Sequence, residues 1–415
     1  MNILFVHQNF PGQYRELFQW LIAQGGHQIV FLTQRKGVPA VKGARIIEYT
    51  AHHKPADTAY APTKYWEECT GNGLGAAFAA QKLAAAGFRP DIILGHVGWG
   101  ELTFLKQVWA DVPIIGFFEY YFLAQGGSVG FDPEFPASDH APFLMHARNA
   151  VNFANFQTVD LGQSPTFFQR DTYPTNFHDK IYVCHDGIRT DRLLPNPHAR
   201  VPLSRLGRAV TRDDEIFTYM SRNMEPVRGF HKFMRALPQI LAERPNARAL
   251  IIGGNEVSYG KASDAQGGYR AEMEREIGAR VDWDRVHFLG KVPYAAYQQI
   301  IQISRAHVYL TVPFVLSWSS MEAMSMGATI IASDTAPVRE VMKHGENALL
   351  VDFHDHNALA AQVIEVLARP EAFSQLGQAA RAHMIANYDF TTKCLPTHIA
   401  RINSLVPKGR AIPLR

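Results

Sequence analysis

Short apolar runs alternate with segments of helical period along the whole chain. In the first half the runs predict strands at Ile3–Val6, Gln28–Leu32, Asp91–Leu94, Ile114–Phe117, Thr158–Leu161 and Lys180–Cys184, with helices that include Gly12–Gln24 and Gly75–Ala86. In the second half they predict strands at Ile216–Tyr219, Ala249–Ile252, Val286–Phe288, Val308–Leu310 and Thr329–Ala332, with helices near Gly229–Glu243, Gly268–Ile277, Tyr294–Ile303 and Ala358–Ala368. This alternation is typical of α/β folds, and the two sets predict two doubly wound parallel sheets.

Proline residues and mixed charge mark a linker at Asp191–Glu215. We place the domain boundary near residue 198, so that the domains span 1–198 and 199–388. Two loops, Ala124–Asp139 and Asn255–Gly268, are longer than a connection needs. Loops of this kind often carry function, so both are candidates for a lid or an acceptor-contacting segment.

Composition supports a globular protein of two domains. The chain has 415 residues, of which 47% are hydrophobic and 19% charged, and this length exceeds what one core usually holds. A net charge of +3 is too small to indicate a nucleic-acid partner. A local cluster of Arg200, Arg205, Arg208 and Arg212 is either a solvated face or a contact for anionic lipid.

Cysteine usage and the N-terminus predict a cytoplasmic protein. Cys69, Cys184 and Cys394 are odd in number, far apart in sequence and without metal-ligand spacing, which favours a reduced compartment over a disulfide framework. The start, MNILFVHQNF, has a short apolar run without a preceding basic segment, so it predicts a strand and neither a signal peptide nor a membrane span. Peripheral contact with the inner face of the membrane stays open.

Ligands of open parallel sheets bind beyond the carboxyl ends of the strands, so the turns after the strands are the places to search. In HQNFPGQYREL, Gly12 would let backbone amides and a helix N-terminus approach a phosphate, although Pro-Gly is also ordinary turn chemistry. The chain has no GxGxxG motif, so a nicotinamide cofactor loses its main support. In SRNMEPVRGF, Arg222 and Arg228 could bind diphosphate oxygens, or be two surface arginines.

Three titratable residues, His96, Glu101 and Glu119, follow neighbouring predicted strands. Each taken alone is more often structural, but three at one sheet edge indicate a catalytic site. In the second half, Ser319 and Glu322 fit the S-x-x-E capping box. Alternatively, Glu322 accepts hydrogen bonds from the two ribose hydroxyls of a nucleotide.

Several motif matches do not predict a metal site or a serine nucleophile. The DWD at Asp282–Asp284 precedes a strand and so lies at the wrong sheet edge for a metal-binding DxD motif. The DFHDHN at Asp352–Asn357 lacks zinc spacing, and no G-x-S-x-G elbow occurs. We therefore expect no metal and no cofactor.

Taken together, the chain resembles the glycosyltransferase family 4 proteins. The resemblance rests on the ordered set NFPGQYREL, VCHDGIRTDRLLP, SRNMEPVRGF, VHFLGKVPYAAY, SWSSMEAMSMGATIIASDTAPVREVMKHGENALLVD and NYDFTTKC, which spans nearly the whole chain. It implies the GT-B fold, in which two Rossmann-like domains face a central cleft, and a C-terminal helix in 389–415 that returns to the first domain. It also implies an enzyme that transfers a hexose-type sugar from a UDP- or GDP-sugar, without a metal and with retention at the anomeric carbon. The implied acceptor is a hydroxyl group of a saccharide or a lipid-linked molecule, in polysaccharide or glycolipid synthesis.

The resemblance also implies residue roles. Arg222 and Arg228 would hold the donor diphosphate, the backbone around Lys291 and Val292 would meet the base, and Glu322 the ribose. The remaining predicted donor contacts are Gly12 at the phosphates, the amides near Leu316 and Ser317, and Ser319. Two positions depart from the family pattern: Phe314 stands where a second acidic residue is common, and Glu119 where many members have histidine.

These departures leave three functions open. The first is sugar transfer, with Glu119 and His96 as the predicted catalytic residues. The second is an epimerase or a phosphorylase on the same fold. The third is a non-catalytic subunit that binds a nucleotide sugar, because Phe314 cannot hydrogen-bond a sugar hydroxyl.

Overall fold

The computed structural model describes residues 1–414 and divides into two compact units. The first comprises Met1–Gly187 and the chain from Phe390 onward, and the second comprises Ile188–Asp389. The division lies before the predicted boundary at 198. The reason is that Ile188 already donates its amide hydrogen to the carbonyl oxygen of Tyr388 (2.8 Å), and Leu193 accepts a hydrogen bond from Arg381 (2.9 Å). The start of the predicted linker therefore packs with the second unit.

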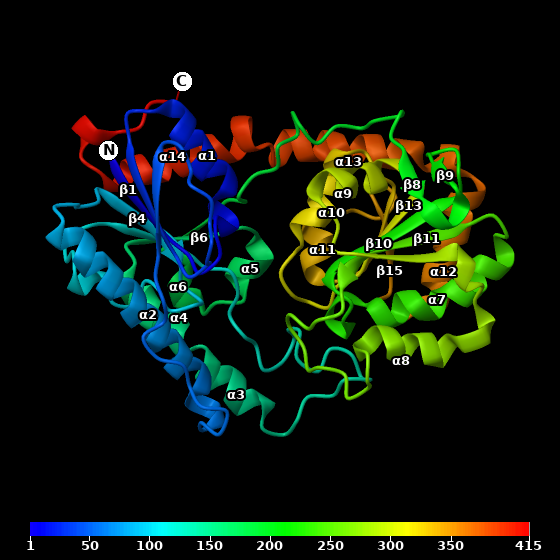
Figure 1. Ribbon diagram of the computed structural model, residues 1–415, viewed down its shortest axis with the longest axis horizontal. Coiled ribbons are helices and arrows are strands. Elements are labelled where there is room, and N and C mark those ends of the chain that lie inside the picture. Colours follow the sequence, from blue (N-terminus) through cyan, green and yellow to red (C-terminus); the bar gives the residue numbers. More distant parts are fainter. Residues whose placement is uncertain (415) are drawn as a thin grey trace. The chain divides into compact units, whose positions relative to one another are not determined.

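The first unit contains one seven-stranded parallel sheet (Figure 1). Its strands, in spatial order, are β3 (Ala44–Glu48), β2 (Gln28–Thr33), β1 (Asn2–Val6), β4 (Ile92–His96), β5 (Ile114–Phe117), β6 (Leu161–Ser164) and β7 (Ile181–Val183). Its helices are α1 (Arg15–Gln24), α2 (Ala61–Ala85), α3 (Ala141–Arg148), α4 (Ala150–Thr158), α5 (Phe167–Asp171), α6 (Thr175–His178) and α14 (Leu395–Leu405).

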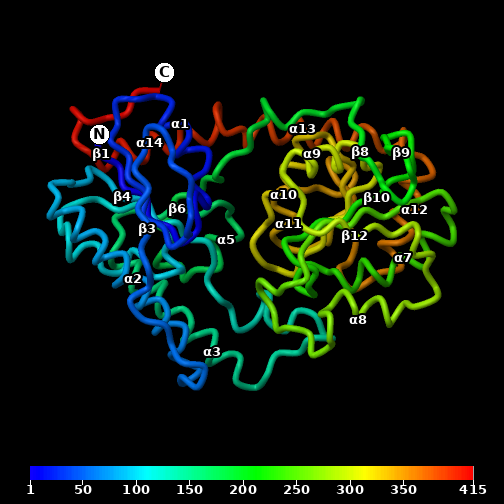
Figure 2. The backbone as a smooth tube through the Cα atoms, viewed as in Figure 1, coloured from blue at the N-terminus to red at the C-terminus, as the bar shows by residue number. Residues whose placement is uncertain are grey.

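Alternate residues of the central strands fill two cores, one on each face of this sheet. Phe5 pairs with Phe31 in register and packs on one face against α1 and α14, so the last helix lies beside the first (Figure 2). Leu4 and Val30 point to the other face and pack against α2. Burial on both faces explains why these strands are almost continuously apolar.

The second unit contains a six-stranded parallel sheet, again with helices on both faces (Figure 1). Its strands, in spatial order, are β12 (Val286–Gly290), β11 (Arg248–Gly254), β10 (Ile216–Asn223), β13 (Ala306–Tyr309), β14 (Ile330–Ser333) and β15 (Leu349–Val351). Its helices are α7 (Phe230–Glu243), α8 (Gly268–Ile277), α9 (Tyr294–Ile303), α10 (Trp318–Ser325), α11 (Ala336–Val341), α12 (His356–Ala368) and α13 (Ser374–Asn387). The predicted pair of doubly wound parallel sheets is confirmed.

Three local predictions were wrong. Thr158 ends helix α4, and strand β6 begins only at Leu161, with the polar sequence LGQS. Helix α2 begins at Ala61, well before the predicted Gly75. Its glycines allow close packing and do not end the helix. An added Cβ on Gly71 would lie 2.2 Å from the carbonyl oxygen of His53, and one on Gly75 would lie 2.3 Å from the carbonyl oxygen of Thr50. The predicted linker contains a two-stranded antiparallel ladder, β8 (Val201–Leu203) with β9 (Arg208–Val210).

No helix within residues 1–414 combines the length and the apolar character that a membrane crossing requires.

Candidate functional site

A cluster of titratable side chains lies at the carboxyl ends of β1, β4 and β5 in the first unit. His96 and Glu119 come together, with Nε2 of His96 3.4 Å from Oε2 of Glu119. Gln13 donates from Nε2 to Oε1 of Glu119 (3.4 Å), and the ring of His7 lies 5.5 Å from that of His96. His96 is buried, whereas the side chain of Glu119 is 32% exposed, so Glu119 presents the cluster to solvent or a ligand.

Backbone contacts set the tautomers of both histidines. Nδ1 of His7 accepts the amide hydrogen of Asn9 (2.9 Å), and Nδ1 of His96 accepts that of Gly98 (3.0 Å). In each neutral ring the proton therefore resides on Nε2. For His96 this proton points at Glu119 and stabilises its ionised form.

The environment lowers the pKa values of two members of this cluster, His7 and Glu119. Burial, and then the charge of His96, lowers the pKa of His7 to about 3. Burial would raise the pKa of Glu119, but its contacts with His96, His7 and Gln13 outweigh burial, so this pKa lies below the ordinary value. Near neutral pH the cluster thus holds a neutral His7 and an ionised Glu119. Perturbed pKa values of this kind are common at functional sites.

Glu101 is the third predicted member of the cluster and is fully buried. Its Oε1 accepts the amide hydrogen of Gln8 (2.7 Å), and Tyr49 and His96 lie beside it. Burial raises the pKa of Glu101 from an ordinary 4.5 to about 7, against the opposing effect of His96. Glu101 therefore holds the turn after β1 in place and shows no exposed surface for a substrate.

Replacing Glu101 by glutamine is expected to flatten the pH dependence of stability. Because the folded-state pKa is raised, the wild-type stabilisation is full below pH 4.5 and is lost as pH rises through about 7. A shift of this size corresponds to about 3 kcal/mol. Thermal unfolding between pH 5 and pH 8 should show Glu101→Gln gaining stability over wild type as pH rises. The exposed Glu68, replaced by glutamine, is the control, and parallel profiles for wild type and Glu101→Gln would contradict the expectation.

Gly12 lies in contact with the ring of His7. Its φ is +57°, and an added Cβ would lie 2.9 Å from Cε1 and from Nε2 of His7. Only glycine meets both conditions without strain. At Gly12 the backbone between β1 and α1 therefore approaches the ring of His7 too closely to leave room for a side chain.

The second unit buries Arg228 beyond the carboxyl end of β10. Its Nη1 donates to Oγ1 of Thr311 (2.8 Å) and to the carbonyl oxygen of Val315 (3.1 Å). The guanidinium carbon lies 5.4 Å from the ring centre of Tyr259 and 5.7 Å from that of Phe314. Phe314 thus packs beside the arginine.

Arg222, the other predicted phosphate ligand, occupies the end of β10 and is exposed. The two arginines therefore differ in structural importance. Arg228 holds the loop before α10 through its hydrogen bonds, whereas Arg222 carries its charge at the surface.

Helix α10 is linked to Arg228 through one tyrosine. The hydroxyl of Tyr309 lies 3.4 Å from Nη1 of Arg228 and accepts the amide hydrogen of Ser317 (2.9 Å). Ser317 is the N-cap of α10 and accepts the amide hydrogen of Ser319. A buried cation and the N-terminus of a helix, both favourable to anions, are thereby held in one hydrogen-bonded network.

The predicted capping box of Ser319 and Glu322 is wrong. Because Ser317 caps the helix, Glu322 lies in its second turn, too far along to reach the cap. Instead, Oε1 of Glu322 accepts the hydroxyl hydrogen of Tyr294 (2.7 Å), at the start of α9. Glu322 therefore does not cap α10. Its hydrogen bond joins α10 to Tyr294, which follows the turn after β12.

Lys291 and Val292 lie in that turn, between β12 and α9. Nζ of Lys291 pairs with Oε2 of Glu256 (2.8 Å), and both side chains are more than half exposed. Val292 is partly buried and packs against the hydrophobic core of the second unit. The structure thus places the predicted base-contacting segment at the same sheet edge as Arg228 and Glu322.

The loop Asn255–Gly268 is tied to the same edge by Glu225. Its Oε2 accepts the amide hydrogens of Ser258 (3.2 Å), Tyr259 (3.0 Å) and Gly260 (3.3 Å). The carboxylate is fully buried, so these hydrogen bonds offset the cost of burying its charge. This contact holds Tyr259 over Arg228.

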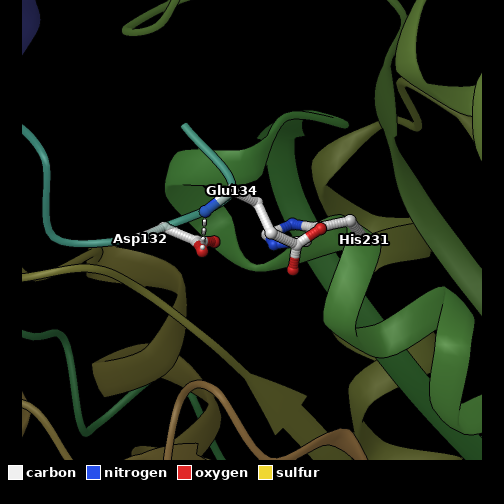
Figure 3. A group of neighbouring side chains, drawn as sticks. All are labelled: Asp132, Glu134 and His231. Carbon is white, nitrogen blue, oxygen red and sulfur yellow. Dashed lines mark hydrogen bonds between the residues drawn. The ribbon is translucent and has the colours of Figure 1, made fainter. Parts of the chain in front are cut away.

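The other long loop, Ala124–Asp139, contains a local turn in which Oδ1 of Asp132 accepts the amide hydrogen of Glu134 (3.1 Å; Figure 3). In the second unit, His231 lies in the first turn of α7 (Figure 3), 6.2 Å from Phe353 between ring centres. The role of either long loop as a lid or acceptor segment stays a prediction.

The two acidic motifs act locally in the structure. Asp282 accepts the amide hydrogen of Asp284 (3.1 Å) and pairs with Arg285 (2.8 Å), just before β12. Asp355 caps α12 by accepting the amide hydrogens of Asn357 and Ala358. Both aspartates are thus engaged at the start of helical turns.

A cavity of about 500 Å³ lies elsewhere in the first unit, between β3 and α2. It is lined by residues that include Arg45, Tyr49, Phe78 and Lys82, and by none of the predicted site residues. The predicted donor and catalytic residues therefore do not belong to this cavity.

The site residues that were not predicted include His7, Gln13, Glu225, Tyr294 and Tyr309. His7 could have been found, because it directly follows the first predicted strand. Tyr294 and Glu225 carried no signal, because their importance comes from partners 28 and 33 to 35 residues away.

Known proteins resemble this chain in both halves. The family model "Glycosyl transferase family 4 group" matches residues 25–193, and "Glycosyl transferases group 1" matches residues 208–383. D-inositol 3-phosphate glycosyltransferase of Streptomyces scabiei is 24% identical over 298 residues, which cover 70% of this chain and 61% of that protein. Phosphatidyl-myo-inositol mannosyltransferase of Mycobacterium leprae is 27% identical over 211 residues, which cover 50% of this chain and 49% of that protein. The chain thus spans about half to three fifths of these relatives.

Solved structures match over almost the full chain. Sucrose-phosphate synthase from Thermosynechococcus elongatus has a TM-score of 0.70 at 18% identity and covers 97% of this chain and 98% of its own. HepE of Anabaena, in complex with UDP-glucose, has a TM-score of 0.67 at 16% identity and covers 97% and 99%. With the two family models matching in the order of the two sheets, this protein belongs to the glycosyltransferase family 4 group and has the GT-B fold.

Proposed function

We propose that this protein is a retaining glycosyltransferase that moves a hexose from a UDP- or GDP-sugar to a hydroxyl group of a saccharide or lipid-linked acceptor. One observation carries the proposal: Arg228, Tyr309, the capped N-terminus of α10 and Glu322 form a connected set at one edge of the second sheet. Such a set supplies a cation and a helix dipole for a diphosphate, and a carboxylate for a ribose.

Relatives support the choice of substrates. HepE of Anabaena is solved with UDP and with UDP-glucose, and a mannosyltransferase of Mycolicibacterium smegmatis is named as GDP-mannose-dependent. Several relatives are named for inositol phosphate or phosphatidylinositol acceptors. We therefore favour a uridine or guanosine donor, and an acceptor that carries an inositol or sugar hydroxyl.

In the proposed reaction, Arg222, Arg228 and the α10 N-terminus stabilise the leaving diphosphate as the glycosyl bond breaks. The acceptor hydroxyl attacks from the face that the diphosphate leaves, and a diphosphate oxygen takes its proton. No metal is needed in this scheme, because two arginines and a helix dipole supply the positive charge. Glu119, whose side chain is 32% exposed and held by His96, positions the acceptor hydroxyl.

A panel of UDP-, GDP- and ADP-sugars tests the proposal by thermal shift and by donor consumption. We expect one base to stabilise the protein, and we expect Glu322→Gln to weaken that donor about tenfold or more, since it removes a charged acceptor. Tyr294→Phe is the matched control, because it removes the hydrogen bond from Tyr294 and leaves the Glu322 carboxylate in place.

The same panel separates the rival functions. Consumption of donor without an acceptor, or only with free phosphate, would indicate an epimerase or a phosphorylase. Stabilisation by a nucleotide without consumption of any donor, across inositol, saccharide and lipid-linked acceptors, would indicate a binding subunit. Either result would overturn the proposed transfer.

A further inference from the structure

Two cysteines that are far apart in sequence meet where the C-terminal segment rejoins the first unit. Cys184 follows β7, and Cys394 ends the turn Phe390–Cys394 that leads into α14. Sγ of Cys184 lies 3.8 Å from the carbonyl oxygen of Cys394, and the Cys394 thiol is hydrogen-bonded to Cys184. Sγ of Cys184 also lies 3.7 Å from Nε2 of His398, in the first turn of α14.

We propose that Cys184 and Cys394 form a redox-active thiol pair, in which Cys184 is the reactive thiolate and His398 its counter-ion. This pair takes no part in the proposed sugar transfer. It would be a modification site for small oxidants such as hydrogen peroxide.

The groups around the sulfur favour its ionised form. The hydrogen bond from Cys394, and then His398, lower the pKa of Cys184 although burial raises it. Burial would lower the pKa of His398, but Cys184, Asp186 and the His185 carbonyl group raise it above the ordinary value. A thiolate beside an imidazolium is the arrangement that makes cysteines reactive.

Neighbouring contacts orient the imidazole of His398. Nε2 lies 3.0 Å from the carbonyl oxygen of His185, and Nδ1 lies 3.4 Å from the hydroxyl of Tyr182. Arg401, one turn further along α14, lies 5.3 Å from the ring centre of Tyr182. Partners on both nitrogens hold the ring edge toward Cys184, as a counter-ion requires.

The two segments are held at a fixed separation beside the sulfurs. An added Cβ at Gly187 would lie 2.7 Å from Cα of Phe390, and the glycine has a φ of +95°. Cys184 and Cys394 each lie within a few residues of this contact. The thiols therefore stay together without closure of a mobile loop.

The chemistry balances with peroxide as the oxidant. The Cys184 thiolate attacks one peroxide oxygen, the O–O bond breaks, and hydroxide leaves and takes a proton to become water. The sulfenic acid formed on Cys184 is then attacked by the Cys394 sulfur. A disulfide forms, and the hydroxyl group leaves as water with the thiol proton, so two thiols and one peroxide give one disulfide and two waters.

The third cysteine is an internal control. Cys69 is buried in the same unit, and burial, and then Glu101, raise its pKa above the ordinary value. Its thiol should therefore remain protonated and unreactive in the folded protein.

The test treats the full-length protein with one equivalent of hydrogen peroxide, blocks free thiols with N-ethylmaleimide and maps peptides by mass spectrometry. We expect a disulfide between the Cys184 and Cys394 peptides and unchanged Cys69. In Cys394→Ser, dimedone should instead trap a sulfenic acid on Cys184. Peroxide consumption without a cross-link, or equal modification of Cys69 and Cys184, would overturn the proposal.

A second measurement separates a counter-ion from a merely structural histidine. Iodoacetamide should alkylate Cys184 at pH 6 about tenfold or more faster than Cys69, and His398→Asn should abolish that advantage while the reaction at pH 9 changes little. An unchanged pH profile in His398→Asn would rule out the ion pair. The disulfide mapping tests the cysteine pair in wild type alone, so that result does not depend on how well a variant folds.

Discussion

Replacing Arg228 by alanine is expected to lower kcat by about 100-fold or more, the loss seen when a donor that stabilises developing negative charge is removed. It should also destabilise the second unit by about 1–3 kcal/mol, because the buried hydroxyl of Thr311 and the carbonyl oxygen of Val315 lose their donor. Donor turnover at saturation and thermal unfolding measure the two effects.

Arg222→Ala is the matched comparison. Arg222 is exposed at the end of β10, so its removal should lower turnover while the unfolding midpoint stays close to that of wild type. Arg228→Lys should retain charge but lose the planar set of donors, giving an intermediate loss. Near-normal turnover in both alanine variants would defeat the assignment of these arginines to the leaving group.

Gly12→Ala is expected to be destabilising for two separate reasons. A left-handed φ costs about 1–2 kcal/mol for alanine, and the methyl group would meet the buried ring of His7 at 2.9 Å, where overpacking adds about 1–3 kcal/mol. Displacing His7 also disturbs Glu119, so both the unfolding midpoint and turnover should fall.

Gly37→Ala separates the two causes. Gly37 has a φ of +66° in the same unit, but nothing lies within 4 Å of its added Cβ. It should therefore show the backbone cost alone and keep full turnover. Equal losses in the two variants would show that contact with His7 is unimportant.

Strands buried on both faces were predictable, because a run such as Ile3–Val6 is apolar without interruption. Strand β3 was not predicted, because it lies at the sheet edge and is only half apolar. The polar strand β6 was displaced in the prediction for the same kind of reason: its place is decided by pairing with Ile115 and Ile181 at its two sides. Pairing partners are not encoded in the local pattern.

The candidate site was predicted as types of residue at strand ends, and the structure decided how those residues are used. Arg222 and Arg228 look alike in sequence, yet one is exposed and the other buried under two aromatic rings. Ser319 and Glu322 fit a capping box by spacing, but the N-cap of α10 is Ser317. Tyr309 accepts the amide hydrogen of Ser317 and so orients this turn.

Hydrophobic period and turn chemistry are local properties, so they were enough to predict the α/β class, the two sheets and the strand ends that carry the polar residues. The packed chain was needed to learn which carboxylate is ionised, which arginine is buried and that Cys184 meets Cys394. These outcomes depend on burial and on the distances between charges from separate segments, and both arise only when the chain has packed.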